Sequence, residues 1–230
     1  MKTFTIAALL LMALVTSPAQ TAPYDEARAA IQKRDYATAL RLLRPLANQG
    51  AARAQSMVGG MYASGLGVLR SYEEGVAWFQ KAAAQGYAEA QSNLGVAYVS
   101  GQGVAKNEAA ALTWFRKAAD QGYAPAQFLL GQMYRNGIGV AKNSAEALPW
   151  FRKSAEQGFP KAITALGEMY DTGEGVTKDS VEAYKWLVIA AVQGDEEAKQ
   201  YIVGVDGRLT PKEVDDAKKA AQEWVTNHKK

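Results

Sequence analysis

The chain repeats itself every 36 residues, and this period constrains the fold more than any other feature of the sequence. The clearest copy begins at Ala88 and ends at Tyr123. The same residue types recur one period apart at Trp78, Trp114, Trp150 and Trp186, at Tyr62, Tyr98, Tyr134 and Tyr170, and at Gly50, Gly86, Gly122, Gly158 and Gly194. A period of this length is typical of stacked helical hairpins, in which each unit buries its apolar face against its neighbours. The sequence therefore predicts an all-α solenoid.

Each unit has the pattern of two helices joined by a glycine-containing loop. In the second unit, Leu94 and Tyr98 lie on one apolar stripe of the first helix, and Gly95 beside them lets another helix approach closely. Gly101 is placed to end this helix, and Asn107 to cap the next one. The equivalent caps are Ser71, Asn143 and Asp179. Acidic residues three positions later predict a capping box in three units, at Glu74, Glu146 and Glu182.

The two ends of the chain depart from this unit. We expect a degenerate helical hairpin over residues 20–49, four full units and a partial fifth over 50–204, and a capping helix over 205–230. The four full units begin near Ala52, Ala88, Ala124 and Pro160. The partial fifth unit is expected to be broken by Gly204 and Gly207. Pro149 falls inside a second helix and predicts a kink on its outer face.

The last helix is predicted to cover the end of the solenoid. Thr210 and Glu213 form a capping box at its start. Val188 and Ile189 make the second helix of the fourth unit apolar nearly all round, which is typical of a covered helix. We expect the last helix to contact Val188, Ile189 and Tyr201. The alternative is that Val188 and Ile189 form an exposed partner site.

Residues 1–19 have the layout of a secretory signal peptide. Lys2 precedes an apolar run from Phe4 to Val15, and small residues at Ser17 and Ala19 predict cleavage after Ala19. The apolar run is shorter than the roughly 20 residues that a membrane-spanning helix needs. We therefore expect a periplasmic or secreted protein with no stable membrane insertion after cleavage. An uncleaved membrane anchor is the alternative.

Composition excludes several classes of chemistry. The chain has no cysteine and a single histidine, His228, close to its C-terminus. Disulfides, thiolate nucleophiles and histidine-containing triads therefore have no candidates. The net charge of +3 comes from 26 basic and 23 acidic residues and predicts no nucleic-acid surface. We expect no catalytic residues, no cofactor and no metal, and a cell-wall hydrolase that runs on carboxylates is a less favoured alternative.

The second unit carries the pattern A-x-A-x-x-x-L-G-x-x-Y-x-x-G-x-G-V followed, after a cap, by A-x-x-W-[FY]-x-K-A-A-x-Q-G. With this pattern in four registered copies, the chain resembles the Sel1-like repeats, a branch of the tetratricopeptide-like helical hairpins. The copies depart from it at Gly75, where Ala111 stands one unit later, and at Leu187, where Phe115 stands two units earlier. The resemblance covers about residues 50–204. It implies a right-handed superhelix of antiparallel hairpins that acts as a protein-binding scaffold, and it carries over no catalytic residues.

The resemblance to exported members implies a partner protein or peptide segment, bound by a monomer along the concave face. The outward positions of the first helices line that face at Ser92, Val96, Val99, Phe128, Gln132, Arg135, Asn136, Glu168 and Asp171. An exposed Phe128 beside Arg135 has the composition of an interface hot spot. In the alternative, Phe128 packs against a neighbouring helix. The acidic pair Glu168 and Asp171 favours a partner with a basic end.

Two functions remain open for such a binding face. One is an adaptor. The other is a periplasmic immunity or regulatory protein that occludes a secreted effector or the periplasmic domain of a sensor kinase.

Three further patterns indicate a structural role rather than ligand binding. The recurring glycine pairs are expected to form turns rather than a phosphate-binding loop, and the four tyrosines to pack in the core rather than line a sugar-binding surface. The carboxylates of Asp171, Glu174 and Asp179 lack the spacing of a calcium-binding loop.

Overall fold

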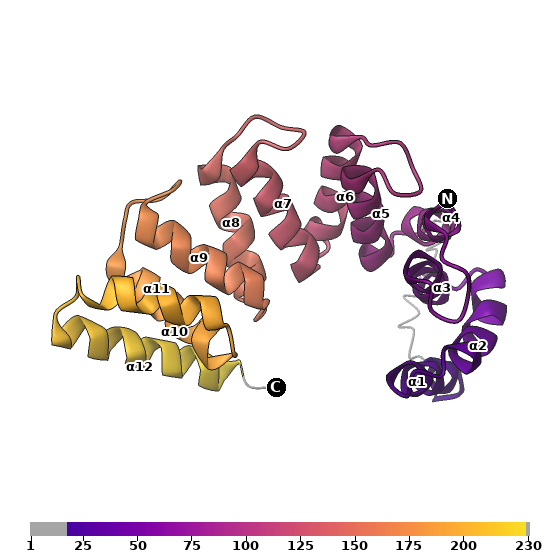
Figure 1. Ribbon diagram of the computed structural model, residues 1–230, viewed down its shortest axis with the longest axis horizontal. Helices are drawn as coiled ribbons and strands as arrows, with labels where there is room; N and C mark the ends of the chain where they lie inside the picture. The colour runs from indigo at the N-terminus through magenta and orange to yellow at the C-terminus, as the bar shows by residue number, and fades with distance from the viewer. Residues whose placement is uncertain (1–17, 229–230) are drawn as a thin grey trace, which may run out of the picture.

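A computed structural model describes residues 18–228, and every regular element in this range is a helix (Figure 1). The helices are α1 Pro18–Gln32, α2 Tyr36–Asn48, α3 Ala52–Ser64, α4 Tyr72–Ala84, α5 Ala88–Ser100, α6 Glu108–Asp120, α7 Ala124–Asn136, α8 Ser144–Ala155, α9 Pro160–Thr172, α10 Ser180–Val192, α11 Glu196–Asp206 and α12 Pro211–Asn227. The predicted all-α solenoid is confirmed. Residues 1–17, which hold most of the predicted signal peptide, lie outside the described residues.

Consecutive helices pair into hairpins, and each hairpin contacts the next. The stack curves into an arch, with α1 and α12 at its two tips and the open side between them (Figure 1). Odd-numbered helices from α3 to α9 are the first helices of the full units, and even-numbered helices from α4 to α10 are the second. Within residues 18–228, no helix combines the length and the apolar character needed to span a membrane.

The second helices are capped as predicted, but not by capping boxes. The side chains of Ser71, Asn107, Asn143 and Asp179 accept hydrogen bonds from backbone N–H groups of the first turn. The backbone N–H of each cap donates to the carbonyl of a tyrosine in the preceding helix, at 2.8 to 3.0 Å, and these tyrosines are Tyr62, Tyr98, Tyr134 and Tyr170. A capping box needs that same N–H as its donor. The capping boxes predicted at Glu74, Glu146 and Glu182 are therefore wrong, whereas the one at Thr210 and Glu213 is present.

Glycines let the helices and loops approach closely. A side chain at Gly95 would place its Cβ 2.7 Å from the ring of Phe115, so the predicted close helix contact is confirmed. At Gly103 the backbone φ is +72°, and a Cβ would lie 2.3 Å from the carbonyl oxygen of Tyr72. The loop therefore rests on the start of the previous unit's second helix. The recurring glycine pairs are structural turns.

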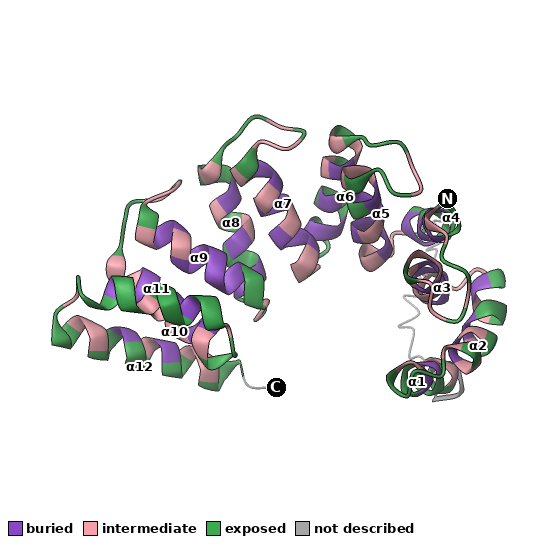
Figure 2. Cartoon of the chain, in the orientation of Figure 1, coloured by how far each residue is buried: buried purple, intermediate pink, exposed green. Residues whose placement is uncertain are grey.

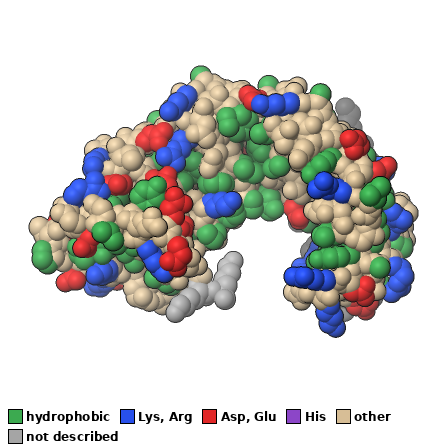
Figure 3. All heavy atoms as spheres, viewed as in Figure 1, with side chains coloured by type: hydrophobic (Ala, Val, Ile, Leu, Met, Phe, Trp, Pro, Cys, Tyr) green, Lys and Arg blue, Asp and Glu red, His purple; other side chains and the backbone are tan. Residues whose placement is uncertain are grey.

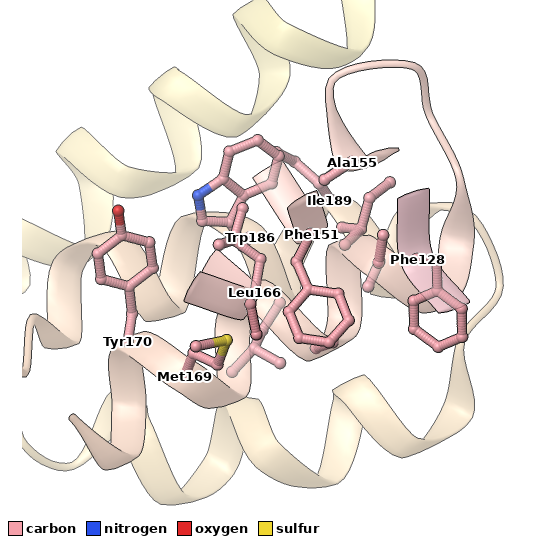
Figure 4. Close-up of a cluster of buried hydrophobic side chains, with 14 of the residues drawn as sticks. Phe128, Phe151, Ala155, Leu166, Met169, Tyr170, Trp186 and Ile189 are labelled. Atoms are coloured by element: carbon pink, nitrogen blue, oxygen red, sulfur yellow. The ribbon is translucent and has the colours of Figure 1, made fainter. Parts of the chain in front are cut away.

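Buried residues lie where neighbouring helices meet (Figure 2). Figure 4 shows part of the largest cluster, with Phe151, Leu166 and Ile189 among its fully buried members. Tyr134 and Tyr170 are also buried, and their hydroxyls are bonded by arginines 18 residues earlier in the chain. The two tyrosines thus belong to the core rather than to a sugar-binding ladder.

A row of glutamine pairs joins the first three full units, and one glutamine of each pair is buried. Gln85, Gln121 and Gln157 donate to Gln55, Gln91 and Gln127, respectively, at 2.7 to 2.8 Å. Each of the accepting glutamines also donates to a carbonyl of the preceding hairpin, at 3.1 to 3.3 Å. In the fourth unit Ile163 takes the place of the accepting glutamine, and the row ends. This glutamine ladder satisfies polar groups at the unit boundaries.

Helix α12 covers α10, as predicted. Ile189 is fully buried, and the ring of Trp224 meets that of Trp186 edge-on at 5.9 Å. An exposed partner site at Val188 and Ile189 is therefore excluded. The predicted contact with Tyr201 is wrong: this side chain is 37% exposed and lies near Glu168.

Two helices continue through residues that were expected to disturb them. Helix α11 runs through Gly204 and ends at Asp206, so Gly204 does not break it. Helix α8 continues through Pro149, which is exposed on the outside of the helix. An exposed position lets the proline ring avoid the core, and the helix tolerates the missing hydrogen bond.

Candidate protein-binding face

The nine predicted binding residues lie on α5, α7 and α9, but they differ in exposure. Val96 is 45% exposed and Asn136 is exposed, whereas Ser92 and Phe128 are buried. The remaining five are half-buried: Val99, Gln132, Arg135, Glu168 and Asp171. The expectation that Phe128 is an exposed anchor is wrong, and Ser92 likewise presents little surface to a partner.

Phe128 is buried because the ring of Phe159, the N-cap residue of α9, covers it. Its ring centroid lies 5.4 Å from that of Phe159 and 5.6 Å from that of Phe151, and Figure 4 shows Phe128 beside Phe151. One unit later, the equivalent pair is polar: Thr164 donates to Asp195 at 2.5 Å. At these two places, residues 31 positions apart therefore meet, and Phe128 belongs to the core.

Arg135 is held by two carboxylates. Its Nε donates to Glu174 Oε2 at 2.8 Å, and its Nη1 donates to Glu168 Oε2 at 3.1 Å. Glu174 also accepts from Ser144 Oγ at 2.8 Å. Burial alone would raise the pKa of Glu174, but the hydrogen bonds from Ser144 and Arg135 hold it below its ordinary value. The network ties α7 and α8 to α9 and the loop after it.

The other acidic residues of this region also have partners within the chain. Asp171 forms an ion pair with Arg208, and Asp179 caps α10. In the part of the chain that the structure describes, no three histidine, aspartate or glutamate side chains gather in a way that could hold a metal ion. Asp171, Glu174 and Asp179 each stabilise the fold at a separate place.

A polar groove of about 230 Å³ opens between α7, α9 and α11. Its lining comprises Phe128, Gln132, Arg135, Lys161, Thr164, Ala165, Glu168, Asp195 and Glu197. Four of the nine predicted residues thus share one groove. The carboxylate of Glu168, with burial and Glu197, raises the pKa of the nearby Tyr201, which indicates an acidic environment.

An apolar hollow of about 210 Å³ lies further toward the N-terminus, between α3, α4 and α5. Its apolar lining includes Val76, Phe79 and Val96, together with Gly60 and Ala63. The hollow exists because these last two residues are small. One unit later their positions hold Val96 and Val99, and further on they hold polar side chains. Only a comparison between units, position by position, would find it in the sequence.

Three aromatic residues mark the start of consecutive first helices and were not among the predicted site residues. They are Tyr87, Tyr123 and Phe159, one period apart and half-buried. Tyr87 donates to Glu89 Oε2 at 3.2 Å. Burial, with the charge of Glu89, raises the pKa of Tyr87 to about 12 and also raises that of Tyr123. Both hydroxyls therefore stay protonated further into the alkaline range than an ordinary tyrosine.

In the space-filling view, hydrophobic side chains gather on the inner surface at the top of the arch (Figure 3). Acidic side chains gather along the inner edge of the limb that carries the C-terminal helices. This inner surface can bind a partner non-covalently through apolar contact at one end and through hydrogen bonds and charge at the other.

Stacked antiparallel hairpins with grooves along their first helices define an α-helical repeat protein. The Sel1 repeat family matches residues 29–50, 52–87, 88–123, 124–159 and 160–195. The matches cover more than half of the chain, and the chain belongs to the Sel1 repeat family. Proteins of this family generally mediate protein–protein interaction, and their repeats typically form non-catalytic scaffolds.

Solved structures agree with this assignment. A Sel1 repeat protein from Oxalobacter formigenes is 33% identical, with a TM-score of 0.73 over 87% of this chain and 82% of its own. A Sel1 repeat protein from Klebsiella pneumoniae subsp. pneumoniae is 22% identical, with a TM-score of 0.55 over 80% and 92%. An immunity protein from Pseudomonas aeruginosa is 22% identical, with a TM-score of 0.45 over 76% and 82%. No curated protein matches the chain.

Proposed function

We propose that the protein is an exported, monomeric scaffold that binds a partner protein, or a peptide segment of it, on the concave face. The observation that carries this proposal is the position of the hollow and the groove. Both open on the first helices, at residues that differ from unit to unit.

The repeated and the variable positions have different tasks. Repeated residues such as Asn107, Gly95 and Phe115 serve as a cap, a close contact and a core ring. The positions of Val96 and Val99 instead hold Gly and Ala one unit earlier, and Gln and Arg one unit later. These positions carry no structural task that all units share, so the residue type can differ between units to match a partner.

Export rests on the signal-like sequence at residues 1–19. Expression in a Gram-negative host should place the protein in the periplasmic fraction, with Gln20 as the first residue found by N-terminal sequencing. Recovery of an intact N-terminus from the cytosol would contradict export, and recovery from the membrane fraction would support the uncleaved anchor.

Site-specific photo-crosslinking tests the binding face. A photoreactive amino acid at the exposed Val96 should capture a discrete partner in cells of the source organism. The control is the same amino acid at Ala77, an exposed residue of α4, a second helix. The proposal requires an adduct from position 96 that is absent at position 77. Equal adducts from both positions, or adducts from neither, would overturn it.

A further inference from the structure

The two depressions on the concave face differ in chemistry. The hollow is lined mainly by apolar side chains from α3, α4 and α5. The groove carries the carboxylates of Glu168, Asp195 and Glu197 against the cations Arg135 and Lys161. Glu174, just outside the groove, also binds Arg135. With three carboxylates against two cations, the groove carries a net negative charge.

The hollow is large enough to receive a side chain. Its volume of about 210 Å³ greatly exceeds the ~15 Å³ that one water molecule requires. An apolar side chain that enters it would displace several waters from the neighbourhood of Val76, Phe79 and Val96. Such burial is favourable in proportion to the apolar area removed from water.

The spacing between the two depressions follows from the repeat. The hollow lies between the first helices α3 and α5, and the carboxylates of Glu168 and Glu197 lie on α9 and α11, three units further along the stack. At about 10 Å for each unit, the two sites are separated by roughly 30 Å. An extended chain covers that distance in about nine residues at ~3.3 Å each.

We propose that the concave face recognises a segment of a partner protein that carries one large apolar side chain and, about nine residues away, a lysine or arginine. The apolar side chain enters the hollow beside Gly60, and the cation lies against Glu168 and Glu197. This inference rests on the proposed function, because it names the chemistry of the segment that the concave face binds.

Gly60→Leu tests the hollow without breaking the fold. A Cβ at Gly60 would meet nothing within 4 Å, and Val96 already holds the equivalent position one unit later. The leucine therefore fills the hollow, and loss of a mid-helix glycine favours the helix. Ala77→Leu adds a similar side chain on the outside of α4, where Ala77 is exposed, and serves as its control.

Glu197→Lys tests the acidic groove. Glu197 is exposed at the start of α11, and the fold uses its backbone N–H, which donates to Asp195. The substitution therefore reverses a charge in the groove and leaves the network of Arg135 in place. Glu223→Lys, at an exposed position of α12, changes the net charge equally and serves as the control.

The probe is a displayed library of random 16-residue peptides, selected on the purified full-length protein. We expect selected peptides to share an apolar residue and a basic residue about nine positions apart. Fluorescence anisotropy should show that Gly60→Leu and Glu197→Lys each weaken a selected peptide about tenfold, whereas both control variants leave its Kd unchanged. Added salt should weaken peptide binding because it screens the basic residue from the carboxylates of the groove, whereas the contact of the apolar side chain should not depend on salt.

The outcomes separate this inference from the proposed function. If peptides are selected and Val96→Asp abolishes their binding, but they lack the basic residue or do not respond to Gly60→Leu and Glu197→Lys, the inference is overturned and the concave scaffold stands. If selected peptides bind equally well to Val96→Asp, the concave face itself is wrong. If no peptide is selected, the inference that the protein recognises a linear segment is wrong.

Discussion

Arg135 and Glu174 are 39 residues apart in the sequence and form a 2.8 Å ion pair that joins the third and fourth full units. Both side chains are mostly shielded from solvent, with 21% and 28% of their surface exposed. Such a pair contributes more to the free energy of unfolding than a fully solvated ion pair, because hydrogen bonds to charged groups are strengthened where water is excluded.

A double-mutant cycle measures this contribution. Arg135→Met and Glu174→Gln should each lower the free energy of unfolding by about 1–2 kcal/mol in urea titrations, and the double variant should lose less than the sum. The control cycle uses Lys199→Met and Glu196→Gln, an exposed pair on α11. Its coupling should stay below about 0.5 kcal/mol. Equal coupling in the two cycles would contradict the role assigned to Arg135.

Glu174 should make the stability of the folded protein depend on pH. Its pKa in the folded protein lies below the ordinary value of 4.5. The folded state therefore gains stability from this group above the ordinary pKa and loses it as the pH falls through the folded pKa. The advantage of the wild type over Glu174→Gln in thermal unfolding should be full at pH 7 and should shrink below about pH 4.5. An advantage that grows on acidification would reverse the sign and refute the assignment.

Two helix glycines should respond in opposite directions to the same substitution. Gly95→Ala places a Cβ 2.7 Å from the Phe115 ring and should destabilise the protein by about 1–3 kcal/mol. Gly60→Ala meets open space and should stabilise it by up to about 1 kcal/mol. Urea unfolding of both variants at one temperature checks the pair, and changes of the same sign would disprove the close contact at Gly95.

Trp224→Ala should loosen the C-terminal end of the solenoid. The ring packs on Trp186 from α12, so its removal should cost about 2–4 kcal/mol and alter the near-ultraviolet circular dichroism of the indoles. Glu223→Ala, at the neighbouring exposed position, should leave both quantities unchanged. A spectrum and a stability that Trp224→Ala does not affect would show that α12 does not cap the stack.

The helices, their caps and the close contact at Gly95 could be predicted because each depends on neighbours within one unit. Asn107 caps the helix that starts at Glu108, and Gly95 faces Phe115 in its own hairpin. The period then places the same contacts in every copy. Local chemistry and the repeat are sufficient for this part of the fold.

The candidate site was harder to predict because it depends on contacts between units. Phe128 is buried by Phe159, which caps the first helix of the next unit, and a helical wheel of α7 alone leaves it exposed. Arg135 has its charge bound by residues 33 and 39 positions away. The hollow at Gly60 arises from an absent side chain, which only a comparison with Val96 one unit later would reveal.

The glutamine ladder has a consequence for the length of the protein. Removal of residues 88–123, one complete period, would leave Gln85 with Gln55 and Gln157 with Gln127, and Gln127 would face Ala83 in place of Ala119. The interior can therefore gain or lose a unit without breaking the ladder, whereas the fourth unit, with Ile163, is fixed at its end. Each unit gained or lost between the hollow and the groove would change their separation by about 10 Å. The number of interior units therefore determines how far apart the apolar and the basic side chain of a bound partner must lie.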